Sequence, residues 1–291
     1  MLTATAHPDV SVATQGETLL AELHAEVVAA LGPDAAQELC IERAVLGVFF
    51  TGVKLSNGVG GLCATPIKSV PEAVCCPSSA MAMPVPGKLA GRNAVQLLQD
   101  LYRPQDLRRA LAIATLNALA ETLWQRDGAP QGVEVQSGDA FDALHIAPGH
   151  RVVLVGAFVP YMRELRKRGQ SFGVLELDMS TLRPDELVFH ISQERAAREI
   201  SEADVLITTG TTLINGTLDG LLENLRPGAQ AAVVGPTATL WPGPFARRGA
   251  TVVGGTRVTD PDVLLDLLAE GGSGYHFFGK SVERICLCVP L

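Results

Sequence analysis

Apolar residues recur along this chain in two periods, one typical of helices and one typical of strands. Gln15 to Leu31 places its apolar side chains three or four residues apart and is followed by Gly32-Pro33, which predicts an amphipathic helix ending at Leu31. Residues 41–55 form a β-branched and aromatic run that predicts a strand. Ser56-Asn57-Gly58 is a hairpin signal, so residues 59–64 are expected to pair with that strand in antiparallel fashion.

The rest of the first half contains two helix patterns between two irregular connections. Residues 65–87 are rich in Pro and Ser and have no clear period, and helices are expected at residues 92–102 and 104–124. Asn117 lies inside the second helix, where a buried amide needs hydrogen-bond partners, so it is either a core residue or a site residue. Residues 127–149 lack a long apolar run and are expected to connect two domains.

The second half alternates short apolar runs with helix patterns. The expected strands are residues 152–155, 173–177, 205–207, 231–234, 252–253 and 284–289, and the expected helices are residues 161–168, 192–202, 216–225, 244–248 and 261–269. Repeated strand-then-helix units with right-handed crossovers give a parallel sheet covered on both faces. The sequence therefore predicts a Rossmann-like α/β domain at residues 149–291, preceded by a smaller domain at residues 1–148.

Composition excludes several classes of protein. A formal net charge of -8 argues against a nucleic-acid partner, because binding to phosphates requires an excess of Lys and Arg. No window approaches the roughly 20 apolar residues that span a bilayer, and the N-terminal residues do not resemble a secretory signal, so no membrane contact and a cytoplasmic location are expected. The six cysteines are then expected to be reduced.

One turn concentrates small hydroxyl-bearing side chains. Residues 208–217, here called the threonine turn, follow the expected strand 205–207. Its candidate ligand-binding residues are Thr209, Gly210, Thr211, Thr212, Asn215 and Thr217. These residues either cap the next helix or cradle a ligand. We favour the cradle, because the number of hydroxyls exceeds what capping needs and because ligands of open α/β sheets bind beyond the carboxyl ends of the strands.

Three other strand ends supply further candidates. Gly156 and Phe158 follow the first strand of the second half, but the G-x-G-x-x-G fingerprint is missing there, so NAD and FAD are disfavoured. Glu176 ends the next strand, where an acid can hold a ribose hydroxyl or a cationic group, or only face solvent. Gly235, Pro236 and Thr237 follow residues 231–234 and are expected to form the opposite wall of the site.

Cysteine pairs suggest a weaker metal hypothesis. Cys286 and Cys288 point to the same face of the last strand and Cys75 adjoins Cys76, so four thiolates could meet around a soft metal. Neither pair has the C-x-x-C spacing of structural zinc sites, and buried free cysteine is common. No residue pattern identifies a catalytic acid, base or nucleophile.

The motifs along the chain resemble those of a family of unknown function labelled putative heavy-metal chelation proteins. The residues that carry the resemblance in the second half are 152–158, Glu176, 208–217 and 234–237. Residues 60–65 and the helix around Asn117 are similar to the enolase N-terminal-like domain that usually precedes it. The resemblance implies a site between an enolase N-terminal-like domain and a Rossmann-like domain, with a role in handling metals or metal-chelating small molecules.

The expected function is therefore binding or processing of a small polar ligand, a metal complex or an organic chelator in an interdomain cleft that Asn117 reaches. A metal ion or metal complex is the expected cofactor class, and the sequence leaves open whether the chain forms a homo-oligomer. One alternative is a transferase that uses a nucleotide-like cofactor such as S-adenosylmethionine. A second is a non-catalytic metal carrier, which the cysteines would serve.

Overall fold

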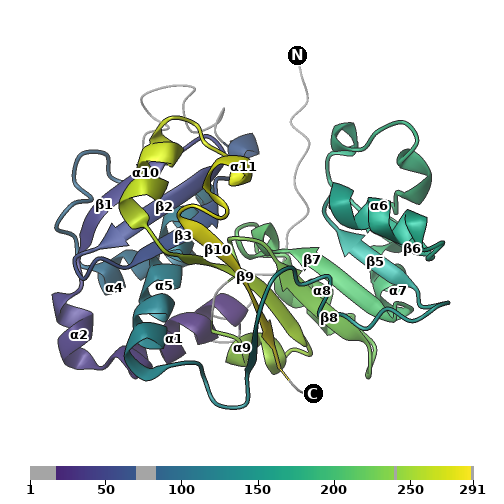
Figure 1. The fold of residues 1–291 in the computed structure, drawn as a ribbon, viewed down its shortest axis with the longest axis horizontal. Coiled ribbons are helices and arrows are strands. Elements are labelled where there is room, and N and C mark those ends of the chain that lie inside the picture. The colour runs from purple at the N-terminus through teal and green to yellow at the C-terminus, as the bar shows by residue number, and fades with distance from the viewer. Residues whose placement is uncertain (1–17, 70–82, 239–240, 290–291) are drawn as a thin grey trace.

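The computed structural model describes residues 18–69, 83–238 and 241–289, and it has an α/β fold with two sheets (Figure 1). The first part contains a three-stranded antiparallel sheet in the order β1-β2-β3, with helices beside it. Its elements are α1 (Leu19–Leu31), α2 (Pro33–Glu38), β1 (Ile41–Leu46), β2 (Phe50–Leu55), β3 (Gly60–Ala64), α4 (Ala94–Leu97) and α5 (Asp106–Asp127). The expected helix before Gly32 and the hairpin at residues 56–58 are confirmed.

The second part is built on a seven-stranded sheet in the order β4-β10-β9-β8-β7-β5-β6. Its strands are β4 (Glu134–Ser137), β5 (Val152–Val155), β6 (Phe172–Leu175), β7 (Val205–Thr209), β8 (Gln230–Val234), β9 (Val252–Val258) and β10 (Val282–Cys288). Its helices are α6 (Val159–Lys167), α7 (Ala196–Ser201), α8 (Leu218–Glu223), α9 (Gly243–Ala246), α10 (Pro261–Ala269) and α11 (Gly274–Phe277). Strands β6, β5, β7, β8 and β9 are parallel, which confirms the expected mostly parallel α/β sheet.

The strands at one side of this sheet differ from the prediction. β10 pairs antiparallel with both β9 and β4, so the last strand does not continue the parallel set. β4 lies inside residues 127–149, which were expected to be only a connection. All four of its residues are exposed, so the strand has no buried face and leaves no alternating pattern in the sequence. The same connection also buries Phe141 and Leu144 in the core beneath β5.

Two predicted elements of the first part are divided. The run at residues 41–55 forms two strands, because the chain turns between Gly47 and Phe50. A side chain at Gly47 would lie 2.5 Å from the carbonyl oxygen of Leu268, so the turn fits closely against α10 only with glycine. The pattern at residues 92–102 forms one short α-helix, α4, followed by a 3₁₀ helix.

The C-terminal elements return to the first sheet. After β9 the chain forms α10 and α11 and then enters β10, and Figure 1 shows both helices beside β1 and β2. α10 packs on β1 and β2, where a side chain at Gly52 would meet Leu265 and Leu268 at 2.8 Å. Leu62 of β3 shares an apolar cluster with Leu265 and Phe277. The two halves of the sequence are thus packed together. None of the described helices is long and apolar enough to cross a membrane.

Candidate ligand-binding site

The candidate site lies where the direction of chain winding reverses in the large sheet. From β5 the chain crosses to β6 on one side, and it then returns to β7 on the other side of β5. Counted from β5, the parallel strands have the doubly wound order 2-1-3-4-5, in which the switch point lies between the first and third strands. The carboxyl ends of β5 and β7 therefore form the crevice in which ligands of such sheets bind.

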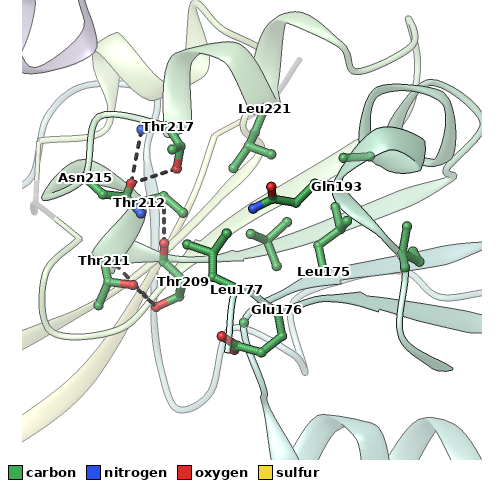
Figure 2. Close-up of a pocket in the computed structure, with 14 residues that line it drawn as sticks. Leu175, Glu176, Leu177, Gln193, Thr209, Thr211, Thr212, Asn215, Thr217 and Leu221 are labelled. Carbon is green, nitrogen blue, oxygen red and sulfur yellow. Dashed lines mark hydrogen bonds between the residues drawn. The ribbon is translucent and has the colours of Figure 1, made fainter. Parts of the chain in front are cut away.

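A cavity of about 250 Å³ opens at this crevice. Its polar lining residues are Glu176, Gln193, Thr209, Thr211, Thr212, Asn215 and Thr217. The remaining lining residues are Val155, Gly156, Leu175, Leu177, Ile191, Ala196 and Leu221. Figure 2 shows the threonines and Asn215 on one side of the cavity, and Leu175, Leu221 and Gln193 on the other. The cavity thus offers a ligand one polar wall and one apolar wall.

The threonine turn is held by its own hydrogen bonds. Thr209 Oγ1 accepts a hydrogen bond from Thr211 Oγ1 at 3.1 Å and caps the 3₁₀ helix Gly210–Leu213, while Thr212 Oγ1 donates to the Thr209 carbonyl at 2.7 Å. Asn215 Oδ1 accepts from the Thr217 hydroxyl at 2.8 Å and from the Thr217 amide at 3.2 Å. Capping and lining of a cavity therefore occur in the same turn. The Asn215 Nδ2 group donates to no residue in the described part of the chain, which leaves it available to a ligand.

Glu176 and Gly156 both line the cavity beside the threonine turn. The Glu176 carboxylate accepts the Ala157 amide at 3.1 Å and the Asp178 amide at 3.0 Å, one on each oxygen. Gly156 has a φ of 106°, and a side chain there would lie 3.2 Å from the Thr209 methyl group. The carboxylate is therefore fixed in position, and glycine permits the turn after β5 to pass close to β7.

An ion pair joins the two parts of the chain near Glu176. Lys68 Nζ, in the segment after β3, lies 2.8 Å from Asp178 Oδ2, in the segment after β6. The Lys68 ammonium group, together with Ser180, lowers the pKa of Asp178 to about 2. Lys68 itself does not line the cavity, and among the residues that the structure describes Glu176 is the only acidic or basic side chain of the lining.

Three candidate residues lie instead between the two parts of the chain. Asn117 does not reach into the cavity, because its Nδ2 group donates to the carbonyls of Leu62 at 2.8 Å and Pro236 at 3.2 Å. Thr237 is buried, and its Oγ1 accepts the Ala64 amide at 3.1 Å. Gly210 packs against Thr237, where a side chain would approach the Ala238 amide nitrogen to 2.8 Å. These residues connect the smaller sheet to the large one rather than line the cavity.

Phe158, Gly235 and Pro236 also lie outside the cavity. The Phe158 ring stacks on Tyr161 with 5.1 Å between centroids, so it packs against the core of the large sheet. Gly235 and Pro236 do not form the opposite wall, and line a second cavity of about 140 Å³ beyond β8 and β9, beside Asp139 and Arg284. The wall facing the threonine turn is formed by Leu175 of β6, Leu221 of α8 and Gln193, none of which the sequence pattern singled out for the site.

Cysteine does not form a metal cluster in the described part of the chain. Cys286 is buried and Cys288 is partly buried, and burial raises the pKa of the Cys286 thiol to about 12. Cys75 and Cys76 lie outside the described residues. Among residues 18–69, 83–238 and 241–289, no group of three or more His, Cys, Asp or Glu side chains is arranged to hold a metal ion.

Two features of the site were missed by sequence reasoning. Ile191 and Gln193 line the cavity, Gln193 from a 3₁₀ helix at Gln193–Arg195 that precedes α7. A helix was expected at residues 192–202, but its pattern did not indicate that its first residues reach the site. Arg109 of α5 donates to the carbonyls of Leu101 at 3.1 Å, Arg103 at 2.7 Å and Ile214. The bond to Ile214 fastens the threonine turn to α5. An arginine in the first turn of a helix gave no signal of this role.

Comparison with known families agrees with the resemblance noted in the sequence. Residues 139–287 match a family described as putative heavy-metal chelation, and residues 28–120 match a second family with the same description. The first match spans half of the chain, so this chain belongs to that family of putative heavy-metal chelation proteins.

The similar proteins support the fold of this chain but do not indicate an activity. An uncharacterized protein of Methanocaldococcus jannaschii is 28% identical over 177 residues, which cover 60% of this chain and 64% of the relative, less than two thirds of its length. A family member of unknown function from Pyrococcus horikoshii has a crystal structure with a TM-score of 0.73 and 18% identity, covering 94% of this chain and 100% of its own. A second, from Desulfitobacterium hafniense, has a TM-score of 0.68 and 16% identity, covering 92% and 98%.

Proposed function

We propose that this protein binds a small organic molecule in the cavity between the ends of β5 and β7, and that this molecule is a metal chelator or its metal complex. The observation that carries the proposal is the composition of the lining, which combines one carboxylate, several hydroxyl and amide groups, and an apolar wall. Small-molecule sites typically have this mixture of apolar surface and a few polar groups that orient the ligand.

The lining argues against a bare metal ion as the ligand. Hard cations need six or more oxygen ligands, and softer metals need several imidazole or thiolate groups. Among the described residues, Glu176 is the only acidic side chain that lines the cavity, and no His or Cys lines it. An organic chelator would supply the missing ligands itself, while its apolar part contacts Leu175, Leu221 and Ile191. Recognition of such a metal–chelator complex would agree with the family description of heavy-metal chelation.

Calorimetric titration tests this proposal with two sets of probes. The first set is Fe³⁺, Ni²⁺ and Zn²⁺ alone, and the second is the same ions as complexes with catechol and aminocarboxylate chelators. We expect saturable binding from the second set, and we expect Thr211→Val and Asn215→Ala to weaken it about tenfold, because each removes a polar group that faces the cavity.

Matched controls are Thr259→Val and Asn224→Ala, which alter exposed residues that do not line the cavity. They are expected to leave the affinity unchanged. Tight binding of the bare ions that persists in Thr211→Val and Asn215→Ala, or equal effects of the site and control variants, would contradict the proposal.

A further inference from the structure

The position of Glu176 relative to Gly156 indicates what kind of molecule the cavity accepts. Gly156 directly follows β5, and Glu176, twenty residues further on, directly follows the neighbouring strand β6. In nucleoside-binding α/β sheets an acidic residue about 20 residues after the glycine turn of the first strand accepts hydrogen bonds from ribose hydroxyls. Here the same spacing is combined with a cavity at the switch point of the sheet.

The carboxylate is oriented for two adjacent donors. Its Oε2 accepts the Ala157 amide and its Oε1 accepts the Asp178 amide, which fixes both oxygens. Each carboxylate oxygen has two acceptor sites, so one on each oxygen is left for a ligand. Two neighbouring hydroxyl groups match such a pair of acceptors, as a pair of ribose hydroxyls does.

The surroundings exclude phosphate but suit a flat base. No Lys or Arg of residues 18–69, 83–238 and 241–289 lines the cavity, and Phe158 stacks on Tyr161 in the turn where a pyrophosphate would have to approach the backbone. Opposite the threonine turn, Leu175 and Leu221 present an apolar surface, and Ile191 adds to the apolar lining.

Two amide groups at the cavity are suited to the polar edge of a base. The side chain of Gln193 and the Asn215 Nδ2 group form no hydrogen bond with the residues that the structure describes. Amide side chains carry both donors and acceptors, which base edges also carry. A volume of about 250 Å³ lies at the lower limit for small-molecule sites, so a nucleoside is better matched to it than a dinucleotide.

We infer that the organic ligand of this cavity contains a ribonucleoside without phosphate groups, whose 2′- and 3′-hydroxyls donate hydrogen bonds to Glu176. This inference rests on the proposed binding site and specifies the class of molecule that occupies it. It also accounts for a single carboxylate among described lining residues that are otherwise uncharged.

Titration with adenosine, guanosine, cytidine and uridine, each beside its 2′-deoxy and 3′-deoxy forms, tests the inference on the unaltered protein. We expect at least one ribonucleoside to bind, removal of either hydroxyl to weaken its binding about tenfold or more, and the 5′-monophosphate to bind no better. Glu176→Gln should weaken binding of the ribonucleoside and leave binding of its 2′-deoxy form little changed. Glu223→Gln, an exposed change on α8, should alter neither.

The outcomes separate this inference from the proposed function. If chelator complexes bind through Thr211 and Asn215 but no ribonucleoside does, the inference is wrong and the proposed function stands. If a ribonucleoside binds and its deoxy forms bind equally well, the assignment of Glu176 is wrong. If neither class of probe binds, both proposals are wrong. Since the deoxy comparison uses the unaltered protein, it decides the question even if Glu176→Gln fails to fold.

Discussion

Glu176 joins two chain segments through its hydrogen bonds and also lines the cavity. It links the turn after β5 to the segment after β6 through two backbone amides, and within the described part of the chain it is the only acidic or basic residue lining the cavity. Its position at a strand end suggested a site residue from sequence alone, whereas its two amide partners depend on how β5 and β6 pair. Likewise, the hydroxyl group of Thr212 was evident in the sequence, but its hydrogen bond to the Thr209 carbonyl was not.

The ion pair beside this carboxylate gives a pH-dependent prediction. Lys68 and Ser180 lower the pKa of Asp178 from its ordinary value of 3.8 to about 2, so the charged form stabilises the fold above pH 3.8 and this stabilisation is lost as the pH falls through about 2. In Lys68→Met the pKa of Asp178 should rise toward 3.8 without fully reaching it, because Ser180 still donates to the carboxylate.

Carboxyl NMR titration of Asp178 measures this shift, and added salt should reduce the difference between the two proteins, since the pair is solvent-exposed. Lys167→Met is the matched control, because Lys167 lies on α6 near Glu164 and not near Asp178. An unchanged pKa in Lys68→Met, or an equal change in Lys167→Met, would show that Lys68 does not set it.

At the scale of elements, apolar spacing and apolar runs predicted those helices and strands that bury several of their side chains. The hairpin β2–β3 and helix α5 followed from turn residues and apolar spacing. β4 was missed because its residues are all exposed, and the antiparallel direction of β10 was missed because it depends on where α10 and α11 lead the chain. Asn117 was correctly seen as needing partners, but which carbonyls it contacts is decided by the packing of α5 against β3.

Helix α5 also supports the threonine turn, and this leads to a second prediction. Arg109 donates to three backbone carbonyls through its planar guanidinium group, including that of Ile214. A lysine cannot reproduce this geometry, so Arg109→Lys should lower the free energy of unfolding by about 1–3 kcal/mol. Amide hydrogen exchange in residues 210–217 should become faster than in the unaltered protein.

Hydrogen exchange followed by mass spectrometry checks the effect at the turn directly and needs no ligand. Arg163→Lys, an exposed change on α6, is the matched control and should leave exchange in the turn unchanged. If Arg109→Lys destabilises the protein but exchange at residues 210–217 stays the same, Arg109 supports α5 and not the site.

For the whole molecule, the packing of α10 on the first sheet predicts that the two halves unfold together. Leu265 is fully buried against β2 and in the cluster with Leu62, so Leu265→Ala should cost about 2–5 kcal/mol. The two tryptophans report on both halves. Trp124 of α5 lies 5.2 Å beneath the guanidinium of Arg257, and Trp241 donates to Glu26 at 2.8 Å.

Single-tryptophan proteins, Trp124→Phe and Trp241→Phe, can be unfolded in urea with and without Leu265→Ala. Both fluorescence signals should shift to lower urea concentration by the same amount. Val263→Ala, on the exposed face of α10, should change the free energy of unfolding from either signal by no more than about 0.5 kcal/mol. Separate transitions for the two tryptophans would mean that the halves are independently stable.

The return of α10 to β1 and β2 also has a consequence for synthesis of the chain on the ribosome. β3 ends at Ala64, but the helix that covers its sheet begins at Pro261. At roughly 5–20 residues per second, translation of the intervening residues takes roughly 10–40 s. Throughout that interval the apolar face around Leu62 lacks its C-terminal cover, so the first sheet cannot complete its packing until α10 has been synthesised.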